Sequence, residues 1–154
     1  MNYREYKEAK QKSVNELPIF WAFSNEQFKE GMEARGLTVD DTDQIYALGA
    51  GGYYLRKDAD VIRAFFMKKD GLRKMMRDPV FAEEAFYDEM CNHEYGINWQ
   101  ADWDVCRCFG NPEYREDAGY EEYLKEMRYS KKVAEAYKTA RRRYFKDAAA
   151  NEWF

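Results

Sequence analysis

The sequence predicts an α+β fold, with a small antiparallel sheet of about three to four strands, several helices packed on it and a long C-terminal helix. Short apolar runs bounded by turn residues indicate the strands. A glycine-rich turn between two strand-like runs indicates a hairpin, and therefore antiparallel pairing. Longer segments carry apolar residues at helical spacing, and the most extended of these lies near the C-terminus.

The N-terminal elements are predicted to be a helix, a strand and a second helix. Residues 2–13 form a polar helical pattern, and the apolar run LPIFWAF at residues 17–23 is typical of a buried strand. Ser24 and Gln27 have the spacing of a capping box, in which each side chain satisfies a free backbone group. We therefore expect a helix to begin at Ser24 and to end at Gly36, a residue suited to the left-handed end of a helix.

The middle of the chain predicts a hairpin followed by a helix. Residues 45–48 and 53–56 are strand-like, and the glycine-rich stretch 49–52 lies between them as a turn. Asp58 is a suitable N-cap residue for a helix that extends to Met76. Gly71 is the point where that helix is expected to divide.

The C-terminal part predicts two further helices with a strand between them. Asp78 and Pro79 form a helix start, because proline at the first helical position loses no needed donor. The alternating pattern of residues 103–109 predicts a strand. Apolar and aromatic residues spaced along residues 120–148 predict one long last helix.

Length and composition predict one domain, made of a compact α+β core at residues 1–110 and a helical extension at 111–154 packed on it. A chain of 154 residues can bury roughly 70% of its extended surface without a disulfide or a metal. An odd count of three cysteines is typical of reduced thiols in a cytoplasm. No apolar run is long enough to span a membrane, and residues 1–10 lack the features of a secretory signal.

Charge is unevenly distributed along the chain, and its basic part is the strongest indication of a partner. The net charge is −4, yet residues 128–146 hold eight basic residues and one acid, which gives +7 there and −11 elsewhere. Tyrosines lie among the basic residues, a composition typical of surfaces that contact phosphates and stack on bases. A solvated helix that pairs with the acidic remainder is the alternative. The predicted partner-binding residues are Lys131, Lys132, Tyr137, Lys138, Arg141, Arg142, Arg143 and Tyr144.

A second cluster of rare residues lies between residues 91 and 110. Trp99, Asp102 and Trp103 form a second predicted partner-binding group, because exposed tryptophan is a frequent anchor of interfaces. Burial of both tryptophans in the core is the alternative interpretation.

The same region contains possible metal ligands. Zinc prefers cysteine and histidine in a tetrahedral arrangement, but the spacing here departs from that of common zinc motifs. Buried free cysteines also behave as small apolar residues, so we predict neither a metal nor another cofactor. The weak metal candidates are Cys91, His93, Cys106 and Cys108.

Paired carboxylates leave a hydrolytic alternative open. Asp102 and Asp104, with Glu94 and His93 nearby in the sequence, have the composition of a metal-dependent hydrolase site. Such acids more often cap helices and turns, and we predict no catalytic residues.

Two stretches of the sequence resemble a known group of proteins. LPIFWAFSNEQF at residues 17–28 and NHEYGINWQADWDVCRCFG at residues 92–110 resemble a family of small uncharacterised proteins carried by gut bacteria, their phages and other mobile elements. The resemblance covers residues 1–110 and leaves out the basic C-terminal helix. No activity is established for that family, but small phage-borne proteins are often defence inhibitors, including anti-CRISPR proteins.

The resemblance and the charge pattern together predict a non-enzymatic inhibitor in the cytoplasm of a bacterial host. Its expected partner is a bacterial defence nuclease, such as Cas9 with its guide RNA, with nucleic-acid contact through the basic helix and no membrane contact. The alternatives are a nucleic-acid-binding accessory protein of a mobile element and the metal-dependent hydrolase described above.

Overall fold

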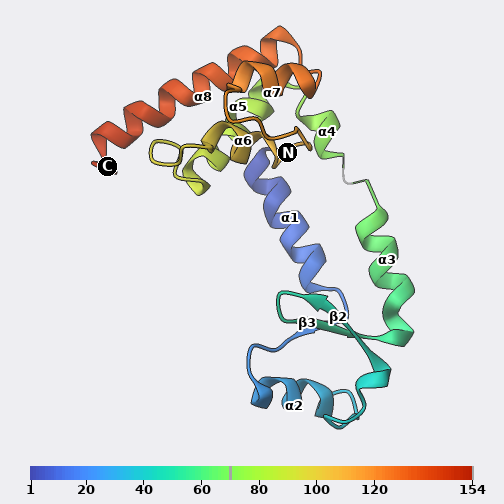
Figure 1. Cartoon of the computed structure of the whole chain (residues 1–154). Helices are drawn as coiled ribbons and strands as arrows, with labels where there is room; N and C mark the ends of the chain where they lie inside the picture. Colours follow the sequence, from blue (N-terminus) through green and yellow to red (C-terminus); the bar gives the residue numbers. More distant parts are fainter. Residues whose placement is uncertain (70, 154) are drawn as a thin grey trace. The chain divides into compact units, whose positions relative to one another are not determined.

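The chain folds into two units, each with its own core (Figure 1). The computed structural model describes residues 1–69 and 71–153. Residues 1–7 and 70–154 make up the helical unit, and residues 8–69 make up the sheet unit. Helix α1 (Tyr3–Asn15) contributes to both. The α+β fold class is confirmed, whereas the predicted boundary between residues 110 and 111 falls inside the helical unit.

The sheet unit contains a small antiparallel sheet with the strand order β1-β3-β2. Strand β1 (Ile19–Trp21) pairs with β3 (Gly52–Leu55), which also pairs with β2 (Ile45–Gly49). The predicted strands at the first apolar run and on both sides of the glycine turn are therefore confirmed. Gly49 and Gly51 both have φ of 87°, a left-handed conformation that favours glycine in the hairpin turn.

One face of the sheet packs against helix α2 (Asn25–Glu33), where Phe20, Met32 and Ile45 form the buried core. The predicted cap is present, because Ser24 Oγ accepts a hydrogen bond from Gln27 N at 3.1 Å. The side chain of Gln27 in turn accepts from the backbone of the residue before Ser24 at 2.8 Å. The helix therefore begins where its free N–H groups have local acceptors.

Gly31 marks the closest approach of α2 to the sheet, and Gly31→Ala is expected to destabilise the sheet unit. A Cβ at this position would lie 2.3 Å from the Phe20 ring. Overpacking of this kind costs about 1–3 kcal/mol, which outweighs the gain in helix propensity of up to about 1 kcal/mol. Urea unfolding measures the change, with the exposed Glu30→Ala on the same helix as control. A penalty that stays the same when Phe20 is shortened to leucine would contradict the clash.

The described part of residues 42–75 contains two short 3-10 turns and two helices, of which the first helix belongs to the sheet unit and the second to the helical unit. A short 3-10 turn η1 (Thr42–Gln44) precedes β2, and another, η2 (Arg56–Asp58), leads into α3 (Ala59–Met67). The predicted division of this helix is confirmed, since α4 (Leu72–Met75) begins after Gly71 with φ of 78°. Asp58 occupies the N-cap position of α3 as predicted, although its side chain makes no capping hydrogen bond.

The helical unit is built mainly on helix α5 (Pro79–Asn92) packed against α8 (Lys131–Ala150). Asp78 caps α5 by accepting from Val80 N at 2.9 Å, as predicted. The fully buried Phe86 of α5 contacts Tyr137 of α8 edge-on, with ring centroids 4.9 Å apart. Helices α6 (Ala101–Cys106) and α7 (Tyr120–Glu126) complete the unit.

The predicted strand at residues 103–109 is wrong, because this segment begins inside helix α6 and continues as turns. Ala101 and Val105 are buried and lie four residues apart, a spacing that places both on the core side of a helix. Trp103 and Arg107 are also four residues apart. The guanidinium of Arg107 lies over the Trp103 ring, with its Cζ atom 4.6 Å from the ring centroid. The residues that alternate as in a strand therefore also fit a helical period, and packing on α5 selects the helix.

The predicted single last helix is also wrong, because it is divided into α7 and α8. Arg128 adopts a left-handed φ of 63°, and the next residue donates its N–H to Leu124 O at 3.1 Å, a common helix ending. Ser130 then caps α8 by accepting from Val133 N at 3.3 Å. None of the described helices has the length and apolar character needed to cross a membrane.

Candidate functional site

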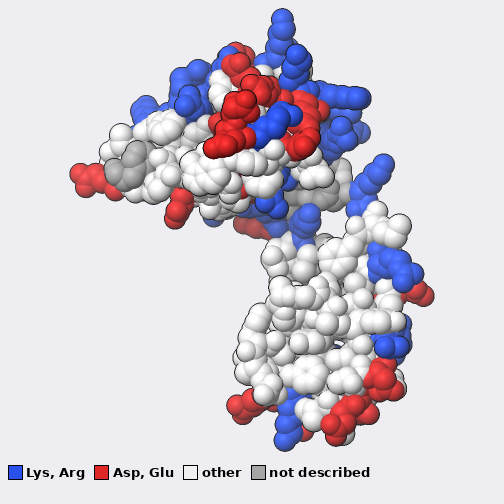
Figure 2. Space-filling view, in the orientation of Figure 1, with Lys and Arg blue, Asp and Glu red and all other residues white. Residues whose placement is uncertain are grey.

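The outward side of α8 carries a row of basic residues that we call the basic face. Helix α8 buries one side in the core of the helical unit, including Val133, Ala140 and Tyr144. Figure 2 shows lysine and arginine side chains along the edge that α8 follows, with a group of acidic side chains beside them over α7. At the helical rise, the row extends over about 22 Å. The residues of the basic face are Lys131, Lys138, Arg142 and Lys146.

The two tyrosines predicted to stack on a partner belong to the core instead. Tyr137 and Tyr144 are almost fully buried. Tyr137 stacks on Tyr120 with ring centroids 4.8 Å apart, and Tyr144 OH accepts from Gly96 N at 3.3 Å. Their spacing along the helix coincides with its buried stripe, so the predicted surface role of both residues is wrong.

Other predicted basic residues are engaged within the unit. Arg141 Nε donates to Tyr95 OH at 3.1 Å. The guanidinium of Arg143 lies over the Tyr87 ring, 3.7 Å from its centroid. Arg143 Nε also forms an ion pair with Asp147 Oδ2 at 3.7 Å. Lys138 lies 3.3 Å from a carboxylate of Glu135, within the basic face itself.

The remaining predicted basic residues are more available for a partner. Lys131, Lys132 and Lys146 are exposed, and the ion pairs described for α8 involve Lys138 and Arg143 instead. Arg142 donates to the hydroxyl of Thr139 at 3.1 Å. The predicted cluster is therefore split between positions that stabilise the unit and positions that face solvent.

The predicted group of Trp99, Asp102 and Trp103 is split in the same way. Trp99 is 77% exposed and contacts Tyr114 edge-on. Trp103 is partly buried and donates its indole N–H to Pro112 O at 3.0 Å. Asp102 points inward, so only Trp99 retains the geometry of an interface anchor.

Asp102 is the acceptor of a buried network. Its Oδ1 accepts from Tyr95 OH at 2.5 Å and from Tyr137 OH at 2.6 Å. Burial, followed by the interaction with Asp102, raises the pKa of Tyr95. Burial also raises the pKa of Tyr137 well above its ordinary value, so both phenols remain hydrogen-bond donors over a wide pH range.

The remaining residues of the predicted hydrolase site do not converge. Asp104 is buried and accepts from the Asn98 side chain, while Glu94 is exposed with φ of 50°. Asp102 and Asp104 are thus satisfied by protein donors, and they face different partners.

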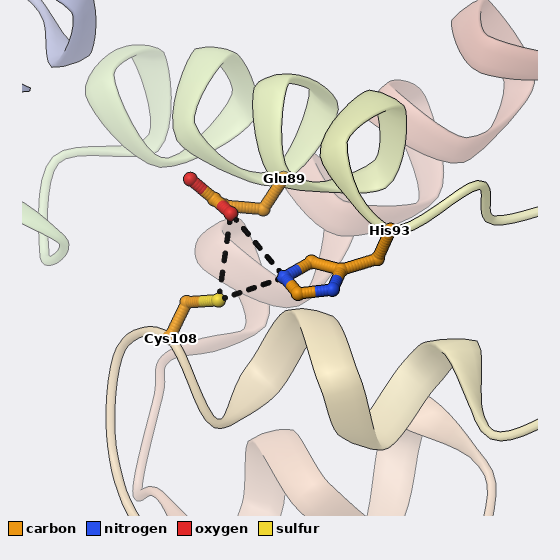
Figure 3. Close-up of side chains that lie close together, drawn as sticks. All are labelled: Glu89, His93 and Cys108. Carbon is orange, nitrogen blue, oxygen red and sulfur yellow. Dashed lines mark hydrogen bonds and ion pairs between the residues drawn. The ribbon is translucent and has the colours of Figure 1, made fainter. Parts of the chain in front are cut away.

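Two of the four weak metal candidates come together with a third residue that was not among them. His93 and Cys108 meet Glu89, whereas Cys106 is buried and Cys91 is exposed (Figure 3). We call Glu89, His93 and Cys108 the donor cluster. The four-residue spacing of Glu89 and His93 on one helix is a signal that was available in the sequence.

The three donor atoms of this cluster are nearly equidistant. Cys108 Sγ lies 3.4 Å from His93 Nε2 and 3.5 Å from Glu89 Oε2. His93 Nε2 lies 3.5 Å from Glu89 Oε2. Glu89 lies on α5, His93 ends that helix, and Cys108 follows α6. Figure 3 shows the three side chains pointing toward one another. Among the described residues, these three side chains bring their ligand atoms close enough together to hold a metal ion.

The surroundings of the cluster divide the two oxygens of Glu89, a carboxylate only 6% exposed. Oε1 accepts from Tyr3 OH at 2.7 Å and lies 3.7 Å from Lys7 Nζ. Oε2 faces the histidine and the cysteine. Burial and the Glu89 carboxylate raise the pKa of Cys108 to about 12, so the free thiol is protonated at neutral pH.

The arrangement differs from a nucleophilic triad. In such a triad, the nucleophile and the carboxylate bind opposite nitrogens of the histidine. Here both Cys108 and Glu89 lie beside Nε2. The three side chains therefore direct their donor atoms toward one point, an arrangement that could hold a metal ion.

The sheet unit offers a surface of a different character, which we call the aromatic sheet face. It lies opposite the face covered by α2, and Figure 2 shows few charges over much of this unit. Trp21 is 50% exposed and Tyr46 is 41% exposed. Their alternation with inward residues was the available sequence signal. The residues of this face are Ile19, Trp21, Tyr46, Leu48 and Tyr54.

Fold and surfaces define a small α+β protein with a basic helix face, an aromatic sheet face and a mixed donor cluster. Residues 2–143 match the family of unknown function DUF7659, and the chain belongs to this family. No curated protein and no solved structure matches the chain. The family description names no activity.

Proposed function

We propose that this protein is a non-enzymatic inhibitor that binds a bacterial defence nuclease, acting as an anti-CRISPR protein on an RNA-guided nuclease such as Cas9. The observation that carries the proposal is the basic face of α8, a row of cations of which Lys131, Arg142 and Lys146 are exposed, on a chain whose net charge is −4. The resemblance noted for residues 17–28 and 92–110 supplies the class of partner.

The basic face suits a partner that carries aligned negative charge. Lys131, Arg142 and Lys146 are exposed on one side of a helix whose opposite side is held in the core. A rigid row of cations over about 22 Å matches a phosphate backbone better than an isolated anion. A nuclease that carries guide RNA presents such a backbone beside protein surface.

The aromatic sheet face supplies a surface suited to the protein part of such a complex. Interface cores are enriched in aromatic residues and depleted of charge. Trp21 and Tyr46 are exposed large side chains of this kind, and Arg56 stacks on the Tyr46 ring at 4.7 Å. A binding protein would use this face as an anchor and the basic face for electrostatic attraction.

A nucleic-acid-binding accessory protein of a mobile element is the second candidate, because the basic face alone would serve it. The two candidates differ in what is bound. An inhibitor forms a stable complex with one nuclease, whereas an accessory protein binds nucleic acid alone with a steep salt dependence.

The test is inhibition of DNA cleavage by purified guide-loaded nucleases, with three forms of the full chain. Wild type is compared with Lys131→Glu/Arg142→Glu/Lys146→Glu and with the control Lys12→Glu/Lys57→Glu/Lys69→Glu, in which the same charge change is made on exposed residues of the sheet unit. We expect stoichiometric inhibition of at least one nuclease by wild type and control, and at least a tenfold loss in the α8 variant.

The outcomes separate the candidates. Binding to free RNA or DNA alone, with a salt slope that falls by about 3 in the α8 variant, would replace the inhibitor by the accessory protein. Failure to inhibit or bind any nuclease of the panel would contradict the proposal.

A further inference from the structure

We propose that the donor cluster is a zinc site, in which Glu89 Oε2, His93 Nε2 and Cys108 Sγ hold the ion and a water completes the tetrahedron. This inference is independent of the proposed function, because it concerns the inner surface between α5 and the end of α6 and not the basic face. Figure 3 shows the three side chains that carry it.

The first argument is the spacing of the donor atoms. Zinc bonds of about 2.0–2.3 Å to sulfur, nitrogen and oxygen, arranged as a tetrahedron, require donor atoms about 3.3–3.6 Å apart. The observed separations are 3.4, 3.5 and 3.5 Å. An ion at the centre therefore fits with little movement of the side chains.

The second argument is the chemistry of the donors. A thiolate, an imidazole and a carboxylate form a set of borderline softness that suits zinc, whereas magnesium and calcium prefer oxygen ligands throughout. Binding would replace the thiol proton by the metal ion, with release of that proton to solvent.

The third argument is the support around the donors. Tyr3 OH and Lys7 bind Oε1 of Glu89 and leave Oε2 directed at the other two donors. Asn92 Nδ2 lies 3.3 Å from the same carboxylate. Outer partners of this kind orient metal ligands and are a regular feature of such sites.

The fourth argument is access and field. His93 is partly exposed, with 35% of its side chain accessible, and Cys108 is partly buried, so an ion and a water can reach the cluster from solvent. His93 also caps the C-terminal end of α5, where the carbonyl groups of the helix favour a cation.

The experiment measures zinc bound to the full chain. Protein stripped with a chelator is equilibrated with zinc, separated from free metal and analysed for metal content. His93→Ala and Cys108→Ala are compared with the control Cys91→Ser, which alters an exposed cysteine near the end of α5. We expect one zinc per chain in wild type and control.

The two ligand variants are expected to bind at least about 100-fold more weakly, more than the loss of an outer partner produces. Cobalt provides a second readout, because a thiolate ligand gives a near-ultraviolet charge-transfer band that Cys108→Ala should abolish. Should the alanine variant of His93 unfold, His93→Gln keeps its bulk. Metal-free wild type, equal zinc affinity in all variants, or a cobalt spectrum without the thiolate band would each overturn the site.

Discussion

Asp102→Ala is expected to lower the free energy of unfolding of the helical unit by about 2–5 kcal/mol. Its carboxylate accepts hydrogen bonds from two buried phenols, Tyr95 OH and Tyr137 OH. A buried donor that loses its acceptor costs about 1–3 kcal/mol, and here two donors lose the same one. Urea unfolding followed by circular dichroism measures the loss.

Controls distinguish this network from a general effect of mutation. Asp102→Asn keeps an acceptor oxygen and should cost less than the alanine variant. Asp117→Ala, at an exposed position, should change stability by no more than about 0.5 kcal/mol. In a double-mutant cycle, Asp102→Ala and Tyr137→Phe should together cost less than the sum of their separate effects. Additive costs, or a neutral Asp102→Ala, would contradict the network.

Alkaline pH is expected to destabilise the helical unit steeply above about pH 10. Burial raises the pKa of Tyr3, and hydrogen bonding to Glu89 raises it further. The pKa values of Tyr95 and Tyr137 are also raised, by burial and then by neighbouring groups. Above the ordinary tyrosine pKa of 10.0, the unfolded chain loses these protons while the native state retains them. Stability is therefore fully present below pH 10 and is lost as the pH rises toward the native values.

The size of this effect follows from the number of protons. Each such tyrosine lowers the free energy of unfolding by about 1.4 kcal/mol per pH unit, so three give roughly 4 kcal/mol per unit. Burial raises the pKa of Cys106 above its ordinary value of 9.0. Its proton therefore contributes to the loss of stability already from about pH 9. Urea unfolding at a series of pH values measures the slope. Tyr3→Phe should reduce the slope by about one proton, and a flat profile up to pH 11 would show that these phenols ionise equally in both states.

The donor cluster and the Asp102 network both draw residues from the segment between residues 91 and 110. In the sequence, this segment is one group of rare residues. Asp102 and Cys106 are directed into the core, whereas His93 and Cys108 meet a buried carboxylate. The orientation of each side chain on a helix end or turn determines which role it has, and a linear pattern does not contain that orientation.

Residue patterns alone determined the elements whose signals are local. The capping box at Ser24, the cap at Asp78 and the glycine turn before β3 each act through backbone groups a few residues away, and each was predicted correctly. The unequal distribution of charge along the chain is likewise a property of the sequence alone.

Tertiary packing decided the features that depend on distant partners. Residues 103–109 fit both a strand and a helical period, and their burial against α5 selects the helix. Tyr137 and Tyr144 have the composition of a stacking surface, yet their side of α8 fills the core. Glu89 joins His93 and Cys108 only because α6 brings a residue nineteen positions away onto α5. Local rules act over one turn of chain, whereas a site built from separate elements exists only once those elements have packed.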